Sequence, residues 1–160
     1  MLLRGSCHCG AVSFSVESAH PYPYNICYCS ICRKTAGGGG FSINLGASSN
    51  SMKISGKQHI KTYRARIENA DGESESPAER KFCEKCASAL WVWDSRWPEL
   101  IHPFASAIDT ELPTPPEKTH LMLTSKATWV EPNIGKQDKE FDEYPDESIS
   151  EWHQRHGVVK

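Results

Sequence analysis

Several short stretches of the 160-residue chain alternate apolar and polar residues, or gather bulky apolar residues between turn-forming ones. Alternation at a period of two places successive side chains on opposite faces of a strand, so these stretches predict half-buried β-strands. Bulky and β-branched runs add to the same prediction. The predicted strands cover residues 12–16, 41–45, 52–55, 89–93 and 120–124.

Other segments predict a helix and loops. Ser148 with Glu151 three positions later forms a capping-box signature, and Gly157 marks a helix end. Residues 65–80 are polar, acidic and free of aromatic residues, which predicts a solvated surface loop. The proline-rich residues 112–116 predict a connector. The whole pattern predicts a mainly β fold with a short C-terminal helix.

Composition narrows the class of protein. With 38% hydrophobic and 24% charged residues, the chain is typical of one globular domain. A formal net charge of -2 argues against a protein that coats nucleic acid, because such proteins carry a basic excess. Neither a stretch of about 20 apolar residues nor an apolar core of a secretory signal is present. We therefore expect a cytoplasmic protein with no nucleic-acid or membrane partner.

The seven cysteines are the most informative feature. Each lies within three positions of another, and neighbours this close strain the geometry of a disulfide. A reducing compartment would also keep them as thiols, so metal binding is the prediction that uses all of them. The cysteines form three clusters: Cys7 and Cys9; Cys27, Cys29 and Cys32; Cys83 and Cys86.

Seven thiols divide into four and three. Zinc prefers four tetrahedral ligands, and a C-x-C pair with a C-x-x-C pair can supply them. Cys7, Cys9, Cys83 and Cys86 are thus predicted to close one structural zinc site. Such a site contributes folding free energy directly, because it does not exist in the unfolded chain.

The remaining cluster can turn three thiols toward one ion from a local loop. Three protein ligands and an open position are usual for catalytic zinc. Spacing alone leaves two alternatives open. In one, Cys32 joins the C-x-x-C pair; in the other, a histidine completes a second structural site, with candidates His8, His59, His102 and His120.

An open, thiolate-rich zinc has a chemistry of its own. It accepts an incoming thiol, because sulfur ligands suit it and coordination lowers the thiol pKa. Zinc also polarises carbonyl groups as a Lewis acid. These two properties together describe the addition of a thiol to an aldehyde.

Three motifs of the sequence resemble the glutathione-dependent formaldehyde-activating enzyme family, which includes the centromere protein V relatives. They are GSCHCG at 5–10, CYCSICRK at 27–34 and FCEKC at 82–86. Weaker similarities occur at 55–63, 107–109 and 120–129, so the resemblance spans about residues 5 to 130. Ala87 departs from the pattern, since the family commonly has glycine after the last cysteine.

The resemblance implies a fold of small antiparallel sheets around a structural zinc, in a domain of residues 1–135. An acidic extension, 136–160, would carry the short helix and pack on or flank that domain. The resemblance also implies the division of zinc ligands given above, with Cys27, Cys29 and Cys32 on a second, labile zinc. The implied activity is condensation of glutathione with formaldehyde to S-hydroxymethylglutathione, a carbon–sulfur lyase reaction.

The sequence therefore predicts an enzyme whose catalytic residues are Cys27, Cys29 and Cys32. Arg33 and Lys34 follow this cluster and are predicted to hold glutathione carboxylates through charge-assisted hydrogen bonds. The alternative is a non-catalytic, zinc-stabilised module that binds glutathione or another protein. A chromatin protein like the centromere relative is disfavoured by the acidic balance.

Aromatic and histidine residues elsewhere are expected to be structural. The tryptophans at 91, 93 and 97 are predicted to belong to the core. His153 and His156, on the predicted helix, are expected to be exposed to solvent rather than to bind a metal.

Overall fold

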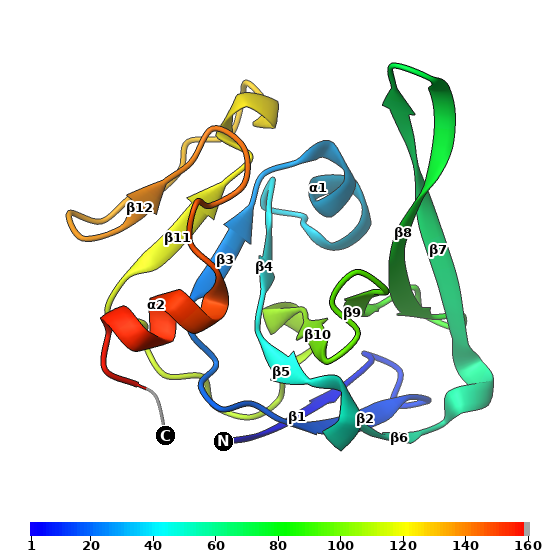
Figure 1. The fold of residues 1–160 in the computed structure, drawn as a ribbon. Helices are drawn as coiled ribbons and strands as arrows, with labels where there is room; N and C mark the ends of the chain where they lie inside the picture. Colours follow the sequence, from blue (N-terminus) through cyan, green and yellow to red (C-terminus); the bar gives the residue numbers. More distant parts are fainter. Residues whose placement is uncertain (159–160) are drawn as a thin grey trace.

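Short strands in three sheets make up most of the protein, seen in a computed structural model that describes residues 1–158 (Figure 1). The last two positions of the predicted extension, 159–160, lie outside the described residues. The first sheet has the order β1 (Leu2–Ser6), β2 (Ser13–Glu17), β6 (Lys53–Ser55). The second has the order β5 (Ala47–Ser48), β10 (Leu100–Pro103), β9 (Ala89–Asp94), β8 (Gly72–Cys83), β7 (Ile60–Asn69). The third has the order β12 (Lys139–Glu140), β11 (Lys118–Leu121), β3 (Tyr24–Cys27), β4 (Ser42–Asn44).

Helices are short and few among residues 1–158. They are α1 (Ser30–Ala36) and α2 (Ile149–Arg155), with 3-10 turns at Ser49–Ser51, Lys57–His59, Ala105–Ala107 and Leu123–Ser125. The predicted mainly β fold with a short C-terminal helix is confirmed. The first two sheets are antiparallel throughout, whereas β11 pairs in parallel with both β3 and β12. No helix of the described residues has the length and apolar character needed to cross a membrane.

The five predicted strands correspond to β2, β4, β6, β9 and β11, each within three residues of the expected bounds. The helix signals also hold. Ser148 Oγ accepts a hydrogen bond from the amide of Glu151, and the Glu151 carboxylate accepts one from the amide of Ser148. Gly157 follows α2 with a φ of +64°, a conformation that glycine adopts without strain.

The main core packs apolar side chains of the first sheet against the inner strands of the second. Phe14 of β2 meets Trp91 of β9 edge to face, with ring centroids 5.1 Å apart. The prediction that three tryptophans lie in the core is right for Trp91, which is buried. Trp93 is half-buried and Trp97 is 48% exposed, so the prediction is wrong for Trp97.

The polar segment 65–80 was predicted to be a loop, and this prediction is wrong. The segment forms most of the long antiparallel hairpin of β7 and β8, which extends away from the body of the protein (Figure 1). Ion pairs between the strands join Arg64 to Glu79 and Arg66 to Glu73. Most side chains of the hairpin touch solvent, so cross-strand charge pairs replace the apolar alternation of a buried strand.

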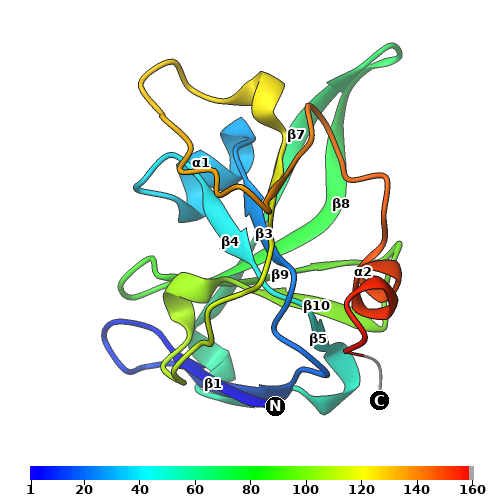
Figure 2. The ribbon, with the colours of Figure 1, turned by 90° about the vertical axis from the view of Figure 1, so that its left-hand side faces the viewer.

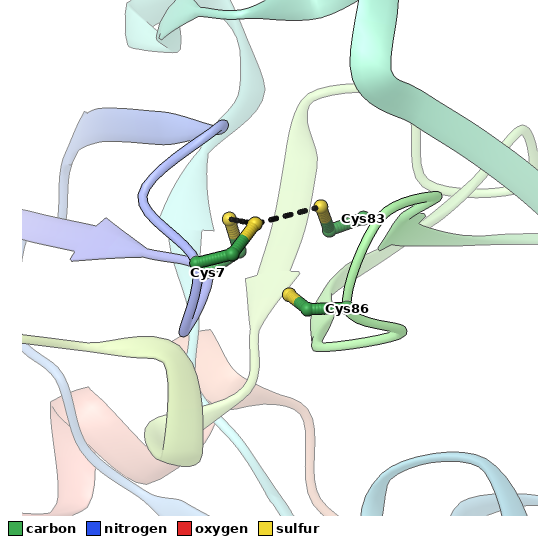
Figure 3. Close-up of side chains that lie close together, drawn as sticks. Cys7, Cys83 and Cys86 are labelled. Carbon is green, nitrogen blue, oxygen red and sulfur yellow. Dashed lines mark hydrogen bonds between the residues drawn. The ribbon is translucent and has the colours of Figure 1, made fainter.

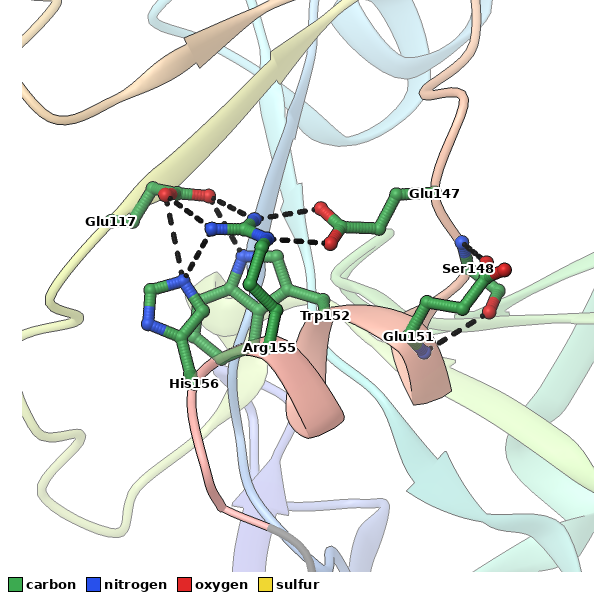
Figure 4. Close-up of polar contacts among 7 residues, drawn as sticks. All are labelled: Glu117, Glu147, Ser148, Glu151, Trp152, Arg155 and His156. Carbon is green, nitrogen blue, oxygen red and sulfur yellow. Dashed lines mark hydrogen bonds and ion pairs between the residues drawn. The ribbon is translucent and has the colours of Figure 1, made fainter.

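Helix α2 is fixed to the rest of the protein by a polar cluster around Glu117 (Figure 4). Trp152 is buried, and its indole N–H donates to Glu117 at 3.0 Å. The guanidinium of Arg155 binds Glu117 at 2.7 Å and Glu147 at 2.7 Å. The ring of His156 stacks on Trp152 at 3.9 Å between centroids.

This cluster corrects the expectation for the two histidines of α2. Both are half-buried rather than exposed. His153 Nε2 lies 2.6 Å from the carbonyl oxygen of Tyr22, and His156 Nε2 lies 3.4 Å from Glu117. Their rings serve in packing the helix, and neither belongs to a group of metal-binding side chains found among residues 1–158.

Replacing Glu117 with glutamine tests the strength of this attachment. Hydrogen bonds from Arg155 hold the pKa of Glu117 below its ordinary value of 4.5, so its stabilisation is complete above that pH. We expect Glu117→Gln to lower the free energy of unfolding by about 1–3 kcal/mol at pH 7. The gap to wild type should narrow as the pH falls below 4.5, because the unfolded chain then takes up a proton that the folded carboxylate still resists, and it closes only below the lowered pKa of the folded state. Denaturant unfolding between pH 3.5 and 7 measures it.

The control for this experiment is Glu147→Gln, which removes the more exposed partner of the same arginine. A pair of this exposure is expected to contribute about 1 kcal/mol or less. Equal effects of the two variants, or a gap that does not narrow between pH 7 and pH 3.5, would contradict the prediction.

Candidate metal and thiol sites

Two turns from distant parts of the chain bring four cysteines together (Figure 3). Cys7 and Cys9 lie in the turn after β1, and Cys83 and Cys86 lie where β8 turns toward β9. All four sulfurs are within 4.8 Å of one another. Cys9 Sγ is 3.6 Å from Cys7 Sγ and 3.8 Å from Cys83 Sγ. A tetrahedral zinc with Zn–S bonds of about 2.3 Å holds its sulfurs about 3.8 Å apart, so this group fits zinc.

Hydrogen bonds shape the two turns around the sulfurs. The amide of Val12 donates to Cys7 Sγ at 3.2 Å, and Ser88 Oγ lies 3.1 Å from Cys86 Sγ. The Ser88 hydroxyl holds the pKa of Cys86 down at about 5, because it donates to the thiolate form. Ser88 also accepts a hydrogen bond from the amide of His8, which joins the two turns directly. The thiolate that metal binding requires is thus favoured locally.

Ala87, between the last cysteine and Ser88, has a φ of +59°. This left-handed conformation is costly for a residue with a Cβ atom and free of strain for glycine. The amide of Ala87 donates to the carbonyl of Cys83 at 2.8 Å, which closes the turn that carries the C-x-x-C pair. The departure from the family's glycine therefore falls at a position whose backbone favours glycine.

Ala87→Gly is accordingly expected to stabilise the protein. The free energy of unfolding should rise by about 1 kcal/mol, because the strain of the left-handed alanine is removed. Denaturant unfolding in zinc-containing buffer measures this. The matched control is Ala89→Gly two residues on, in β9, where glycine should instead destabilise by about 0.5–1 kcal/mol. Destabilisation by Ala87→Gly would show that the prediction is wrong.

The other three cysteines meet at the junction of β3 and α1. Cys27 ends β3, Cys29 is the N-cap of α1, and Cys32 lies in the first turn of the helix. The amide of Cys32 donates to Cys29 Sγ at 3.3 Å, so the capping interaction turns this thiol inward. The three sulfurs lie within 4.8 Å of one another, and Cys27 and Cys32 are buried. We call this group the three-thiol site.

A fourth ligand does not join the three-thiol site from the described histidine, cysteine, aspartate or glutamate side chains. Cys32 is not grouped with the C-x-x-C pair. Of the candidate histidines, His8 is exposed, and the others have different partners. His59 contacts Glu84, His102 contacts the Leu45 carbonyl, and His120 contacts Tyr28 and Asp138.

Polar side chains from neighbouring strands surround Cys32. Both terminal nitrogens of the Arg80 guanidinium lie 3.7 Å from Cys32 Sγ, and Asn44 Nδ2 lies 3.9 Å away. Hydrogen bonds from Cys27 and Cys29, with the charge of Arg80, hold the pKa of Cys32 far below its ordinary value of 9.0. Hydrogen bonding with Cys29 and Cys32, together with burial, raises the pKa of Cys27 instead. The site therefore favours shared negative charge, the form that a soft metal ion binds.

Sequence reasoning missed Arg80 and Asn44. Arg80 falls in the segment 65–80 that was predicted to be a loop, where one arginine among many charges carries no distinguishing signal. In the structure, β8 passes the start of α1 and places the guanidinium beside Cys32. Asn44 lies on β4, which pairs with β3, so its proximity depends on strand register.

The predicted substrate-binding residues line a pocket of about 410 Å³ beside α1. Arg33 and Lys34 share this pocket with the loop at 37–38 and with Ser88 and Ser106. Arg33 Nε is buried and has no hydrogen-bond partner among the described residues. The two cationic side chains that line the pocket suit an anionic ligand.

All seven cysteines are free thiols, so the disulfide alternative does not apply to this structure. The fold and these sites define a class: a mainly β protein with one four-thiol group and one three-thiol group, each of which could hold zinc. In comparisons with known proteins, the family model described as "Glutathione-dependent formaldehyde-activating enzyme" matches residues 2–125. The chain belongs to this family.

Two relatives extend the comparison. A protein of Halomonas elongata named "Putative glutathione-dependent formaldehyde-activating enzyme" is 61% identical over 158 residues, which cover 99% of this chain and 98% of that one. A crystal structure of a Rhodobacter sphaeroides protein superposes with a TM-score of 0.53 at 23% identity, covering 69% of this chain and 91% of the other. The second likeness concerns the fold alone.

Metal content tests the two groups separately. We expect two zinc ions per chain by elemental analysis of protein purified with zinc. Cys29→Ser should carry one, because it removes a ligand from the three-thiol site only. The matched control Ser30→Ala should keep two. One zinc in the wild type, or two in Cys29→Ser, would contradict the assignment.

Proposed function

We propose that the protein is a zinc-dependent enzyme that joins glutathione to an aldehyde, a carbon–sulfur lyase of the S-hydroxymethylglutathione synthase type. The observation that carries this proposal is the three-thiol site, which gathers three ligands and takes no fourth from the described metal-binding side chains. Membership of the family supports the same reaction. Catalytic zinc typically has three protein ligands and an open position.

The proposed reaction forms one bond between sulfur and carbon. The glutathione sulfur attacks the aldehyde carbon, the carbonyl π electrons move to oxygen, and the thiol proton ends on that oxygen as a hydroxyl group. A zinc ion held by Cys27, Cys29 and Cys32 would lower the pKa of a thiol and polarise a carbonyl. The reaction is reversible and needs no oxidant or reductant.

Residues around the three-thiol site support this chemistry. The guanidinium of Arg80 sits beside Cys32, where it can donate to an oxygen that gains negative charge. Arg33 and Lys34 are proposed to hold the carboxylates of glutathione in the adjoining pocket. Helix α1 is about 10 Å long, close to the reach of an extended tripeptide, so one molecule can span pocket and thiols.

The same features suggest where the protein works. Seven free thiols are maintained in a reducing compartment, so we propose that it is cytoplasmic. Its proposed partners are a small thiol and a small electrophile. The rival proposal is a zinc-stabilised module that binds glutathione without turnover.

Exchange kinetics decide between these proposals. Wild-type protein should accelerate adduct formation from glutathione and formaldehyde, measured by magnetization-transfer NMR against buffer alone. Glutathione binding by calorimetry with no acceleration for any carbonyl compound would favour the binding module and overturn the enzyme.

The pocket residues are tested by Arg33→Gln and Lys34→Glu. Each should raise KM for glutathione about tenfold or more, since a charge-assisted hydrogen bond contributes about 1.5–3 kcal/mol. The matched control is Lys57→Glu, at an exposed residue just before β7. It should leave the KM for glutathione unchanged. An unchanged KM for glutathione in both pocket variants would contradict the proposed contacts of Arg33 and Lys34 with the glutathione carboxylates.

A further inference from the structure

A segment near the C-terminus runs beside the three-thiol site. Residues 138–147, which we call the strap, include β12 and lead into α2 (Figures 1 and 2). The strap follows residues 120–124 through a series of backbone hydrogen bonds. They are Phe141 N to His120 O at 2.8 Å, Met122 N to Glu143 O at 2.9 Å, Leu123 N to Phe141 O at 3.2 Å and Thr124 N to Asp142 O at 3.2 Å.

The strap reaches the cysteines because β11 pairs with β3. Leu121 lies opposite Cys27 in that pairing, and these residues form one apolar cluster with Cys32. The half-buried ring of Phe141 packs against this cluster. A side chain of the strap therefore forms part of the apolar surroundings of the sulfurs.

Tyr144, three residues further along the strap, directly follows Glu143, whose carbonyl accepts a hydrogen bond from the amide of Met122 at 2.9 Å. Met122 packs against the same apolar cluster of Cys27, Cys32 and Leu121, so the strap reaches the surroundings of the site just before Tyr144. The residue is nevertheless 72% exposed. A large aromatic ring left in solvent beside a site gains burial when a ligand fills the space next to it.

Both ends of the strap are fixed. At the first end, Asp138 binds the amide of Lys118 at 2.9 Å and contacts His120 Nε2 at 3.2 Å. At the other end, Glu147 binds Arg155, which also binds Glu117 (Figure 4). The strap is therefore held in place, as a wall of a binding site must be.

A strained residue lies where the strap and the site meet. Met122 has a φ of +60°, and among the described residues outside glycine only Ala87 shares this region. Its amide is bonded to Glu143 of the strap. Strained backbone of this kind persists only where surrounding contacts impose it, and it concentrates at functional sites.

The strap lies beyond the part of the chain that the family model matches, which ends at residue 125. The alignment with the Halomonas elongata relative covers 99% of this chain, so it includes the strap. The seven cysteines, Arg33, Lys34 and Arg80 all fall within the matched part. Differences between this chain and other members can therefore arise in the strap without change to the thiols.

We propose that Phe141 and Tyr144 form a specificity-determining wall of the three-thiol site, which admits short aldehydes and excludes longer ones. This rests on the proposed function. Phe141 packs against the apolar cluster of Cys27, Cys32 and Leu121, so its ring narrows the space beside the sulfurs that the alkyl chain of a longer aldehyde would need. Tyr144 covers a ligand from the solvent side. Neither residue takes part in bond making.

Relative rates with two aldehydes test the wall. Formaldehyde and butanal are each combined with glutathione, and kcat/KM is measured for wild type, Tyr144→Ala and Phe141→Leu. Each variant should raise the butanal-to-formaldehyde ratio about tenfold. Tyr144→Phe keeps the ring and should keep the wild-type ratio. The control Trp129→Ala removes another exposed aromatic residue beyond residue 125, whose ring lies beside Gly40, and should leave the ratio unchanged.

Alkylation of the cysteines gives a second readout that needs no turnover. Zinc-loaded protein is treated with iodoacetamide or with pyrenylmaleimide, and labelling of Cys27, Cys29 and Cys32 is followed by fragmentation mass spectrometry. Tyr144→Ala should speed labelling by the bulky reagent about tenfold relative to the small one. Trp129→Ala should not.

The two measurements separate the possible failures. If the wild-type protein accelerates adduct formation with neither aldehyde but the labelling ratio shifts as expected, the proposed enzymatic activity is wrong and the proposed wall is supported. If the rate ratios of Tyr144→Ala and Phe141→Leu and the labelling ratio of Tyr144→Ala all stay within twofold of wild type, the wall is overturned.

Discussion

The convergence of four sulfurs from two distant turns is the contact on which the rest of the site depends. Cys9 and Cys83 are 74 positions apart, and closing so long a loop has an entropic cost that a shared ion would offset. Cys83 is also the last residue of β8, so the four-thiol group fixes the end of that strand. Arg80 stands three residues before it, beside Cys32. One group of thiols thus helps to position a cation at the other.

Local features of this fold could be predicted from sequence, whereas features set by strand pairing could not. Each cysteine cluster could be predicted because it lies within one turn, and the capping box at Ser148 is equally local. The joining of two clusters into the four-thiol group depended on counting ligands, since spacing left other divisions open. The hairpin of β7 and β8 escaped prediction because charged residues occupy both faces. Arg80 lies on β8, so its place beside Cys32 was not predicted either. Asn44 depends on the register of β4 against β3, which spacing along the chain does not encode.

The histidines show why counting possible ligands from sequence is ambiguous. A buried polar ring needs hydrogen-bond partners, and any partner it finds competes with a metal. His120 is buried between Tyr28 and Asp138, and His102 contacts the Leu45 carbonyl while burial lowers its pKa. These contacts depend on tertiary structure. Once they are known, three thiols without a fourth such side chain become the simplest description of the second site.

The proposed activity and the proposed selectivity depend on two different parts of the chain. The portion shared with the family supplies the sulfurs and the cationic side chains, which suit the proposed addition of a thiol to an aldehyde. Selectivity among aldehydes needs a surface that a longer alkyl chain would meet, and such a surface must be rigid to discriminate. The strap has this rigidity because Asp138 fixes its start and the Glu117–Arg155–Glu147 cluster fixes its end. Helix α2 then acts as an anchor, holding a wall against a site to which it contributes no ligand.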